Sequence, residues 1–465
     1  MDVTTVVLFS VLGYQSLLLG IGLWASRRTK SDSDYFIGNR QMGPWITGIS
    51  YSASASSAWT LLGVSGAAFT LGPAVVWVAL GSFSGMLVAW TWVAPRLLEA
   101  SHRRELTTFT EYLTSDVRPT DRTAIVRSIA AVTLIAFVFY IAAQFQGAGF
   151  ALSESFAISN GLAIIVGATV ILIYTWLGGY WAVSVTDAVQ GVVMGIAALA
   201  LPISISLHLG SPEALLEAVA THRGPLSNLS PITLSTVGFV IGSLSIGLGT
   251  FGQPHLMVRF MALKDHGARQ TAARITLVWY LIVFSGMVFT GLSGRALVTE
   301  IDNAEQIFFA LANVVLPPVA AGLLVAAVLS AIMSTADSQL LVCASTLSHD
   351  LARDTYQESG ARIATGRVAV LGVVLLAIAV ALWLPAPIFS RVLFAWSALG
   401  AALGPTLFAR LLQWEISPRH TVLGIWLGFL LTVGFSFLPN TAGDILERLL
   451  PFFLHGLFLT LVGRR

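Results

Sequence analysis

Long apolar runs separated by short polar segments constrain this chain more than any other feature of its sequence. A helix that crosses a membrane needs about 20 mainly apolar residues. Each backbone polar group inside a bilayer must be paired within the protein, so such runs predict helices. We therefore expect an all-α membrane protein with thirteen transmembrane helices, the longest run being divided at Pro317 and Pro318. The runs lie at about 5–25, 44–69, 73–95, 125–152, 161–178, 184–208, 235–253, 272–294, 309–347, 365–384, 389–409, 421–438 and 446–462.

The composition agrees with this class of protein. Hydrophobic residues make up 56% of the chain and charged residues 10%, whereas soluble domains carry about 25% charged residues. The net charge is only +2 and no basic cluster is visible, so we expect no nucleic-acid partner. The single cysteine, Cys343, excludes an intrachain disulfide.

The distribution of basic residues predicts the orientation, because Lys and Arg collect in cytoplasmic loops. With the N-terminus outside, thirteen spans place all but four of the 25 basic residues in inner loops. One span more or fewer would invert every later loop, so we predict an N-out, C-in topology. The four exceptions are Arg223, Arg295, Arg391 and Arg448.

Two of the apolar runs are poor continuous helices. The second contains "GISYSASASSAWTLLG" at 48–63, and the seventh contains "GSLSIGLGTFGQPH" at 242–255. Glycine is unfavourable in helix interiors, although small residues also permit close helix packing in membranes. Each run opens a set of five spans, and weakened segments at matching positions of two inverted halves predict a transporter's binding site.

These sets divide one transporter domain, 1–465, into four parts. The first inverted repeat would cover 44–208 and the second 235–412. A first flanking helix and inner loop would occupy 1–43, and two C-terminal flanking helices 413–465. No soluble domain or long linker interrupts this arrangement.

A stripe of hydroxyl groups runs along the ninth span. Ala331, Ser334, Thr335 and Ser338 lie at i, i+3, i+4 and i+7, which is one face of a helix. Uncharged oxygens suit a monovalent cation that must bind weakly and leave again. Ser and Thr also bond to the preceding turn or bridge helices, and this reading stays open here.

Asp187 and Asp337 are the only carboxylates in the interior of the predicted spans, and the other 21 acids lie in loops or near span ends. A charge at the bilayer centre costs roughly 2.5–3.5 kcal/mol on insertion scales, so such residues are expected to be functional and paired. We expect neither acid to have a buried Lys or Arg on its own or a neighbouring helix. A bound cation is the predicted partner, with a proton or a helix–helix hydrogen bond as alternatives.

Little in the sequence favours catalysis. The eight His residues are scattered without metal-ligand spacing, and "GLGTFG" lacks the lysine and the preceding strand of a phosphate-binding loop. We expect no enzyme and no organic cofactor.

Four stretches resemble the sodium/solute symporter family, and the similarity extends over nearly the whole chain. They are "DYFIGNRQMGP" (34–44), "AVSVTDAVQ" (182–190), "FGQPHLMVRFMA" (251–262) and "MSTADSQLLVC" (333–343). The resemblance implies a five-plus-five inverted-repeat (LeuT-like) core with flanking helices, and Na+ as the coupling ion. The sodium ligands that it implies are the carbonyls of Ala53, Ser56 and Ala331 and the hydroxyls of Ser334 and Thr335.

The resemblance also implies a second cation or proton site at Asp187, Asp337 and Ser338. Proline-transporting bacterial members carry Asp at the position of Ala55 and Ser at that of Asp337. In this chain one carboxylate is therefore absent from the second predicted span and present in the ninth.

Among the residues that line the solute cavity in similar members of the family, Trp59 and Tyr140 are retained in this chain. Ile246 and Thr250 stand where those members carry two aromatic residues. We expect this replacement to enlarge the pocket. The solute-binding residues that it implies are Ser57, Trp59, Tyr140, Ile246, Thr250, Phe251 and Gln253.

The sequence therefore predicts sodium-coupled uptake of a small organic solute, most simply an amino acid such as proline, across a bacterial plasma membrane. Proton coupling, a sugar or organic acid as solute, and a channel or membrane sensor are the alternatives. The expected partners are the solute and the lipid bilayer. The oligomeric state stays open, and a monomer would suffice.

Overall fold

The computed structural model describes residues 3–26, 32–177, 179–211, 233–351, 359–438 and 442–463, with four single positions between 213 and 220. Secondary structure in these ranges is helical, apart from one isolated bridge between Met42 and Leu263. The helices of the first half are α1 (Val3–Ser26), α2 (Asp32–Ile37), α3 (Pro44–Ala58), α4 (Ser65–Leu71), α5 (Val76–Val88), α6 (Ala94–Arg104), α7 (Phe109–Leu113), α8 (Pro119–Phe156), α9 (Asn160–Leu177) and α10 (Tyr180–Leu209).

The second half repeats this alternation of long and short helices. Its helices are α12 (Leu234–Leu244), α13 (Pro254–Ala262), α14 (His266–Leu297), α15 (Ile307–Val315), α16 (Pro318–Ser345), α17 (Ser359–Trp383), α18 (Ile388–Leu411), α19 (Pro418–Ser436), α20 (Ile445–Arg448) and α21 (Leu450–Val462). Short 3-10 and π segments join several of them, including η2 (Trp59–Val64) and η5 (Ser245–Gly252).

Ten helical segments of the described chain are long and apolar enough to cross a membrane. One of them, Pro44–Arg104, has 61 residues and would extend about 90 Å as a straight helix at 1.5 Å per residue. That length is three times a hydrocarbon core of about 30 Å. The chain turns within it at Gly72, whose φ of 65° is open to glycine at little cost. The prediction of an all-α membrane protein is thus confirmed at the level of ten candidate spans.

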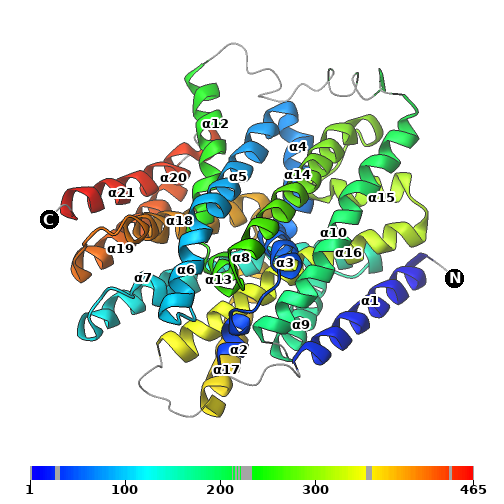
Figure 1. Ribbon diagram of the computed structural model, residues 1–465. Helices are drawn as coiled ribbons and strands as arrows, with labels where there is room; N and C mark the ends of the chain where they lie inside the picture. The colour runs from blue at the N-terminus through cyan, green and yellow to red at the C-terminus, as the bar shows by residue number, and fades with distance from the viewer. Residues whose placement is uncertain are drawn as a thin grey trace.

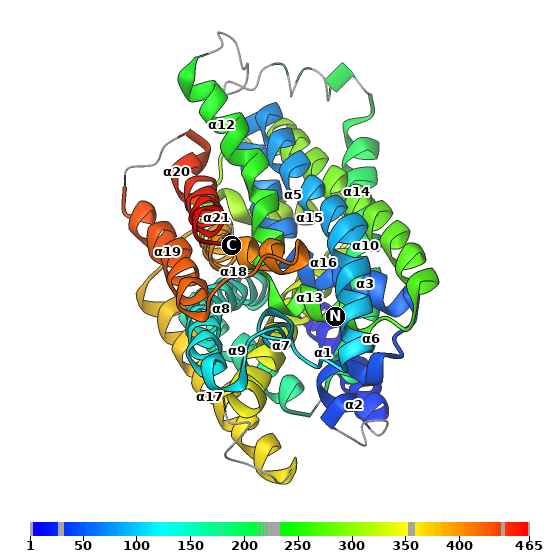
Figure 2. The same ribbon diagram turned by 60° about the vertical axis from the view of Figure 1, so that its left-hand side comes forward.

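The helices that carry the predicted site residues lie in the middle of the molecule (Figures 1 and 2). α3 packs against α10, α14 and α16, and α8 packs against α16 and α18. α1 covers one flank, whereas α19, α20 and α21 cover the opposite flank, so the two chain ends lie on opposite sides (Figure 1). α1 and the C-terminal helices α19, α20 and α21 thus lie on either side of the helices that carry the predicted site residues (Figure 1).

α3 is broken within the serine-rich stretch, as the sequence predicts. Ser57 has φ 53° and ψ −175°, values outside any helix. The backbone N–H of Ala58 donates to Oε1 of Gln144 (3.0 Å), and that of Trp59 donates to Oγ of Ser57 (3.1 Å). Side chains thus replace the helical acceptors that the break removes, which is how a buried backbone tolerates such a conformation.

The seventh run is also interrupted. α12 gives way to the 3-10 segment η5, Gln253 is extended (φ −89°, ψ 100°), and α13 begins at Pro254. A Cβ at Gly249 would lie 1.7 Å from Cδ1 of Trp396, and one at Gly252 would lie 2.0 Å from the carbonyl oxygen of Leu399. The glycines therefore have two roles: they allow close packing against α18, and they allow the helix to unwind at η5.

Candidate functional site

The break in α3 faces the hydroxyl stripe of α16. The hydroxyl Oγ1 of Thr335 donates to the carbonyl of Ser54 (3.0 Å), and Oγ of Ser54 donates to the carbonyl of Ser334 (2.8 Å). In an unbroken helix the N–H of Ala58 would occupy the Ser54 carbonyl, but it bonds to Gln144 instead. The break thus frees the backbone oxygen that Thr335 meets.

The five residues predicted to bind sodium lie on these two facing segments, and all are buried. The carbonyl of Ala331 accepts from Oγ of Ser334 (3.2 Å) and lies 3.1 Å from Oγ1 of Thr335, whereas that of Ser56 accepts from Oγ1 of Thr60 (2.5 Å). A hydroxyl that donates one hydrogen bond keeps two lone pairs. Uncharged oxygens of α3 and α16 therefore surround a buried contact between the two helices. The predicted ligands are Ala53, Ser56, Ala331, Ser334 and Thr335.

Arg259 is the main departure from the sequence-based expectation. The sequence places it in an inner loop and gives Asp187 no arginine partner, and both predictions are wrong. Arg259 lies on α13, is 2% exposed, and places Nη2 2.6 Å from Oδ2 of Asp187. The expectation failed because α13 stays buried after the break at Gln253 and carries Arg259 into the protein. The apolar letters on both sides of Arg259, "HLMVRFMA", were the available signal.

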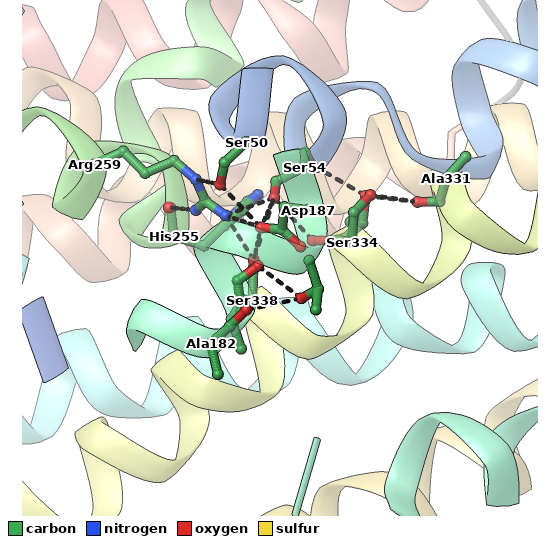
Figure 3. A network of polar contacts seen from close by, with 12 residues as sticks. Ser50, Ser54, Ala182, Asp187, His255, Arg259, Ala331, Ser334 and Ser338 are labelled. Carbon is green, nitrogen blue, oxygen red and sulfur yellow. Dashed lines mark hydrogen bonds and ion pairs between the residues drawn. The ribbon is translucent and has the colours of Figure 1, made fainter. Parts of the chain in front are cut away.

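Asp187 and Arg259 form the centre of a network with three serines (Figure 3). Oδ2 of Asp187 accepts from the hydroxyl of Ser50 (3.0 Å) and lies 3.1 Å from Oγ of Ser54 and 3.3 Å from Oγ of Ser338. Nη2 of Arg259 lies 2.6 Å from Oγ of Ser54 and 2.7 Å from Oγ of Ser338, and its Nε donates to Ser50 (3.0 Å). The guanidinium therefore lies where the sequence predicts a second cation, between Asp187 and Ser338.

Asp337 lies beside this network and does not accept from Arg259. It is fully buried, and neither of its carboxylate oxygens has a hydrogen-bond partner; the same holds for Oδ1 of Asp187. Burial of an unpaired carboxylate is unfavourable unless a proton or cation accompanies it. Three unpaired carboxylate oxygens thus remain on α10 and α16, near the hydroxyl stripe.

The two broken segments are joined by an aromatic contact. Tyr140 of α8 donates its hydroxyl to Oγ of Ser57 (3.5 Å), and its ring centroid lies 6.2 Å from that of Trp396. Trp396 donates Nε1 to the carbonyl of Ile246 (3.1 Å), and Gln253 donates Nε2 to that of Gly249 (3.1 Å). The sequence does not single out Trp396, because a tryptophan within an apolar span resembles any packing residue.

Several buried polar atoms in this region lack a partner within the protein. Trp59 stacks on Phe389 with centroids 5.8 Å apart, yet its Nε1 makes no hydrogen bond. Buried polar groups in folded proteins are rarely unpaired, so these atoms could accept or donate hydrogen bonds to a polar ligand. The others are Oγ of Ser56, Nε2 of Gln144, Oγ1 of Thr250 and Oε1 of Gln253.

Comparison with known proteins decides the family. The model of the sodium:solute symporter family matches residues 35–428. The chain belongs to this family. It is 32% identical over 440 residues to the sodium/proline symporter of Escherichia coli (strain K12), which covers 92% of this chain and 86% of that protein. It is 33% identical over 447 residues to the high-affinity proline transporter PutP of Bacillus subtilis (strain 168), covering 94% and 93%.

Solved structures share the fold of this symporter. A Na+-coupled sialic acid symporter in a substrate-bound outward-open state has a TM-score of 0.81 at 16% identity, with 99% of this chain and 98% of that one covered. MhsT in complex with L-phenylalanine has a TM-score of 0.57 at 15% identity, with 91% and 98% covered. The family that the sequence motifs predicted is therefore confirmed, and the LeuT-like character of the fold agrees with these neighbours.

Phe251, one of the predicted solute-binding residues of the symporter, packs among other aromatic rings. Phe251 packs against Phe408 of α18 with the two rings tilted (centroids 4.8 Å apart, interplanar angle 58°), and Phe408 in turn contacts Phe452. Phe251 thus belongs to an aromatic cluster that reaches the C-terminal helices. The indole of Trp396 lies beside Ile246, to whose carbonyl it donates a hydrogen bond.

Cavities on the two sides of the symporter's site differ in size. The larger, of ≈ 810 Å³, is lined by Gly63, Glu305 and Phe389, the residue that stacks on Trp59. The smaller, of ≈ 30 Å³, is lined by Arg259 and Ser338 and has about the volume of one water molecule. The site is therefore far more restricted on the side of Arg259.

Proposed function

We propose that this symporter takes up a small organic solute together with sodium by alternating access, and that the solute is an amino acid, most simply proline. The observation that carries the proposal is the broken α3, whose free Ser54 carbonyl meets Thr335 of α16. The names of the relatives support proline, since those at 32% and 33% identity are a sodium/proline symporter and a proline transporter.

The proposed sodium site consists of the carbonyls of Ala53, Ser56 and Ala331 with the hydroxyls of Ser334 and Thr335. These oxygens belong to helices from the two proposed repeats, so the ion binds fully only when α3 and α16 are in contact. Sodium binding would in this way order the broken helix before the solute binds. One charge moving through 100 mV gives about 2.3 kcal/mol, which sustains roughly 50-fold accumulation of solute.

The proposed solute site lies against the two broken segments. A zwitterion with a small apolar ring needs donors for its carboxylate, an acceptor for its ammonium group and an apolar wall. Nε1 of Trp59 and Oγ1 of Thr250 are unpaired donors, Oε1 of Gln253 is an unpaired acceptor, and Ile246 is apolar. The site proposed here is Ser57, Trp59, Tyr140, Ile246, Thr250 and Gln253, without Phe251.

A second cation or a proton is proposed at Asp187, Asp337 and Ser338. Asp187 is already paired with Arg259, so a cation that binds there has to displace the guanidinium or share the carboxylate with it. Asp337 has both oxygens unpaired and is the better candidate for a charge that arrives with the solute. Proton coupling remains the alternative at this position.

The proposed topology has thirteen spans, N-out and C-in, in the plasma membrane of a bacterium. Pro44–Arg104 would cross twice, and α1 and α9, whose described apolar stretches are shorter, would add two spans to the remaining nine. The inverted repeats would be 44–208 and 235–412, with 1–43 and 413–465 as flanks.

Uptake into proteoliposomes tests the proposal. Purified protein is reconstituted, and labelled proline is supplied with an inward sodium gradient or with potassium in its place at fixed pH. We expect accumulation against the solute gradient only with sodium. Equal entry with potassium would reject sodium coupling, and the same assay with other amino acids, organic acids and sugars identifies the solute. Passive entry that follows the solute gradient alone would favour a channel.

A further inference from the structure

A second large cavity lies far from the proposed transport site, where several helices end. It measures ≈ 1510 Å³ and is lined by the ends of α6, α18 and α21, the start of α19, and α7. We call it the arginine pocket. Its main charged and aromatic residues are Arg96, Arg103, Arg104, Tyr112, Arg410 and Trp414.

The arginine pocket carries an excess of positive charge. Five arginines line it, against the three carboxylates of Glu99, Asp116 and Glu415. Arg103 is paired with Glu99, and Arg104 lies 2.5 Å from Asp116. Within the described part of the chain, Arg96 and Arg410 form no ion pair with a carboxylate. Two guanidinium groups are thus available to an anion.

Both guanidinium groups are held in place by the backbone and keep donors free. Nε of Arg410 donates to the carbonyl of Leu113 (3.1 Å), while its Nη2 is buried without a partner. Nη1 of Arg96 donates to the carbonyl of Trp92 (2.7 Å), and its guanidinium lies 4.7 Å from the centre of the Trp92 ring. An anchored arginine with unused N–H groups is suited to bidentate recognition of phosphate.

Tyr112 lies among these charges. Burial, and then the nearby charge of Asp116, raise the pKa of its phenol to about 12, while Arg104, Arg410 and Arg96 act in the opposite direction. The phenol therefore stays protonated at neutral pH and can donate a hydrogen bond to an anion.

An apolar row leads along α21 to the pocket. Phe453, Leu457 and Leu461 lie at i, i+4 and i+8 on one face and are 58%, 55% and 75% exposed. Leu461 also lines the arginine pocket. A ligand with a phosphate and a hydrocarbon chain would contact both the arginine pocket and the apolar row of α21, whereas free phosphate would contact only the arginine pocket.

We propose that the arginine pocket binds the phosphate of an anionic phospholipid, with Arg96 and Arg410 as its main donors and the α21 row as the surface for an acyl chain. Basic pockets between transmembrane helices on the cytoplasmic side are known to bind such head groups. The bound lipid would join α6 and α18 of the core to the flanking helices α19 and α21.

Lipid binding to the detergent-purified full-length protein tests the proposal. Phosphatidylglycerol, phosphatidylcholine and glycerol phosphate are titrated, and bound ligand is counted by native mass spectrometry. We expect phosphatidylglycerol to bind with a dissociation constant at least about tenfold lower than either other probe, because only it offers both a net charge and acyl chains. Equal binding of glycerol phosphate would show a site for soluble phosphates, and equal binding of phosphatidylcholine would show no charge recognition; either result overturns the proposal.

Two variants with a matched control separate this site from general surface charge. Arg96→Gln with Arg410→Gln should weaken phosphatidylglycerol binding about tenfold or more. Arg127→Gln with Arg419→Gln removes the same charge from exposed arginines outside the pocket and should leave binding unchanged. Equal loss in both pairs, or no loss in the first, contradicts the proposal. If the first pair does not fold, Leu457→Ser with Leu461→Ser provides the test: unchanged phosphatidylglycerol binding in it would be contrary evidence.

Discussion

Nη2 of Arg259 lies 2.6 Å from Oδ2 of Asp187, and both side chains are buried. This ion pair joins α13, which follows the break at Gln253, to α10. The two helices fall in different proposed repeats, so the pair stabilises one relative position of the halves. A cation or proton that reaches Asp187 would compete with this contact and could release it.

Replacing Arg259 should destabilise the protein strongly. Removal of one partner from a buried pair typically costs about 3–5 kcal/mol, because the other charge stays buried and uncompensated. We expect Arg259→Gln to lower the thermal midpoint in detergent markedly, and Asp187→Asn with Arg259→Gln to recover part of the loss.

The exposed pair of Arg103 and Glu99 provides the control for this prediction. Their side chains are 70% and 56% exposed, and surface ion pairs contribute only about 0–1 kcal/mol. Arg103→Gln should leave the midpoint nearly unchanged. A single Arg259→Gln variant as stable as Arg103→Gln would mean that the buried pair does not hold the two halves together.

The sequence predicted those features that depend on local patterns. Apolar runs of sufficient length predicted the helices, and the 3.6-residue period placed Ser334 and Thr335 on one face. The serine-rich stretch predicted a broken helix, and the structure places the break at Ser57. These predictions agree with the structure because each depends only on residues that are close together in the sequence. The side-chain period of a helix and the conformational cost of its backbone both act within a few residues.

The sequence could not predict contacts that depend on the route of the chain after a break. In the sequence, Arg259 follows the end of the seventh predicted span, and only the path of α13 after the break makes it a partner of Asp187. Trp396 lies about 150 positions from Ile246, the residue whose carbonyl it meets, and no local period relates the two. Phe251 was assigned by its place in a motif, whereas the 3-10 turn of η5 decides where its ring lies.

Removing the paired hydroxyls should weaken sodium dependence. Ser334→Ala and Thr335→Ala each delete one proposed oxygen ligand, a loss of about 1.5–3 kcal/mol for a bond to a charged group. We expect the sodium concentration for half-maximal uptake to rise by about tenfold or more for each variant, and sodium-driven accumulation to disappear in the double variant.

Ser348→Ala is the matched control for the hydroxyl variants. Ser348 follows α16 and donates to the carbonyl of Ala344 (2.7 Å) rather than to α3. Its removal should leave sodium dependence unaltered. Should the double variant of Ser334 and Thr335 behave like Ser348→Ala, the proposed sodium site would be wrong.

Asp337 should decide how many charges move with each solute. Asp337→Asn removes a charge while breaking no hydrogen bond seen in the structure, so the protein should fold. We expect the charge transported per solute, measured from the potential that just balances the solute gradient, to fall by one. An unchanged charge ratio at both pH 6 and pH 8 would show that Asp337 carries neither a cation nor a proton.

Gly249→Ala should abolish uptake through the solute site without touching a sodium ligand. A Cβ at Gly249 would lie 1.7 Å from Cδ1 of Trp396, far inside contact distance, so η5 or the indole must move. Because Trp396 also bonds to Ile246, this movement would distort the proposed solute site.

Gly372 has no neighbour within 4 Å of an added Cβ, so Gly372→Ala should transport normally. We expect Trp396→Ala to restore solute binding partly in the Gly249→Ala background, measured as proline-dependent thermal stabilisation. Failure of this rescue, with both proteins folded, would place the defect in η5 itself rather than in its contact with Trp396.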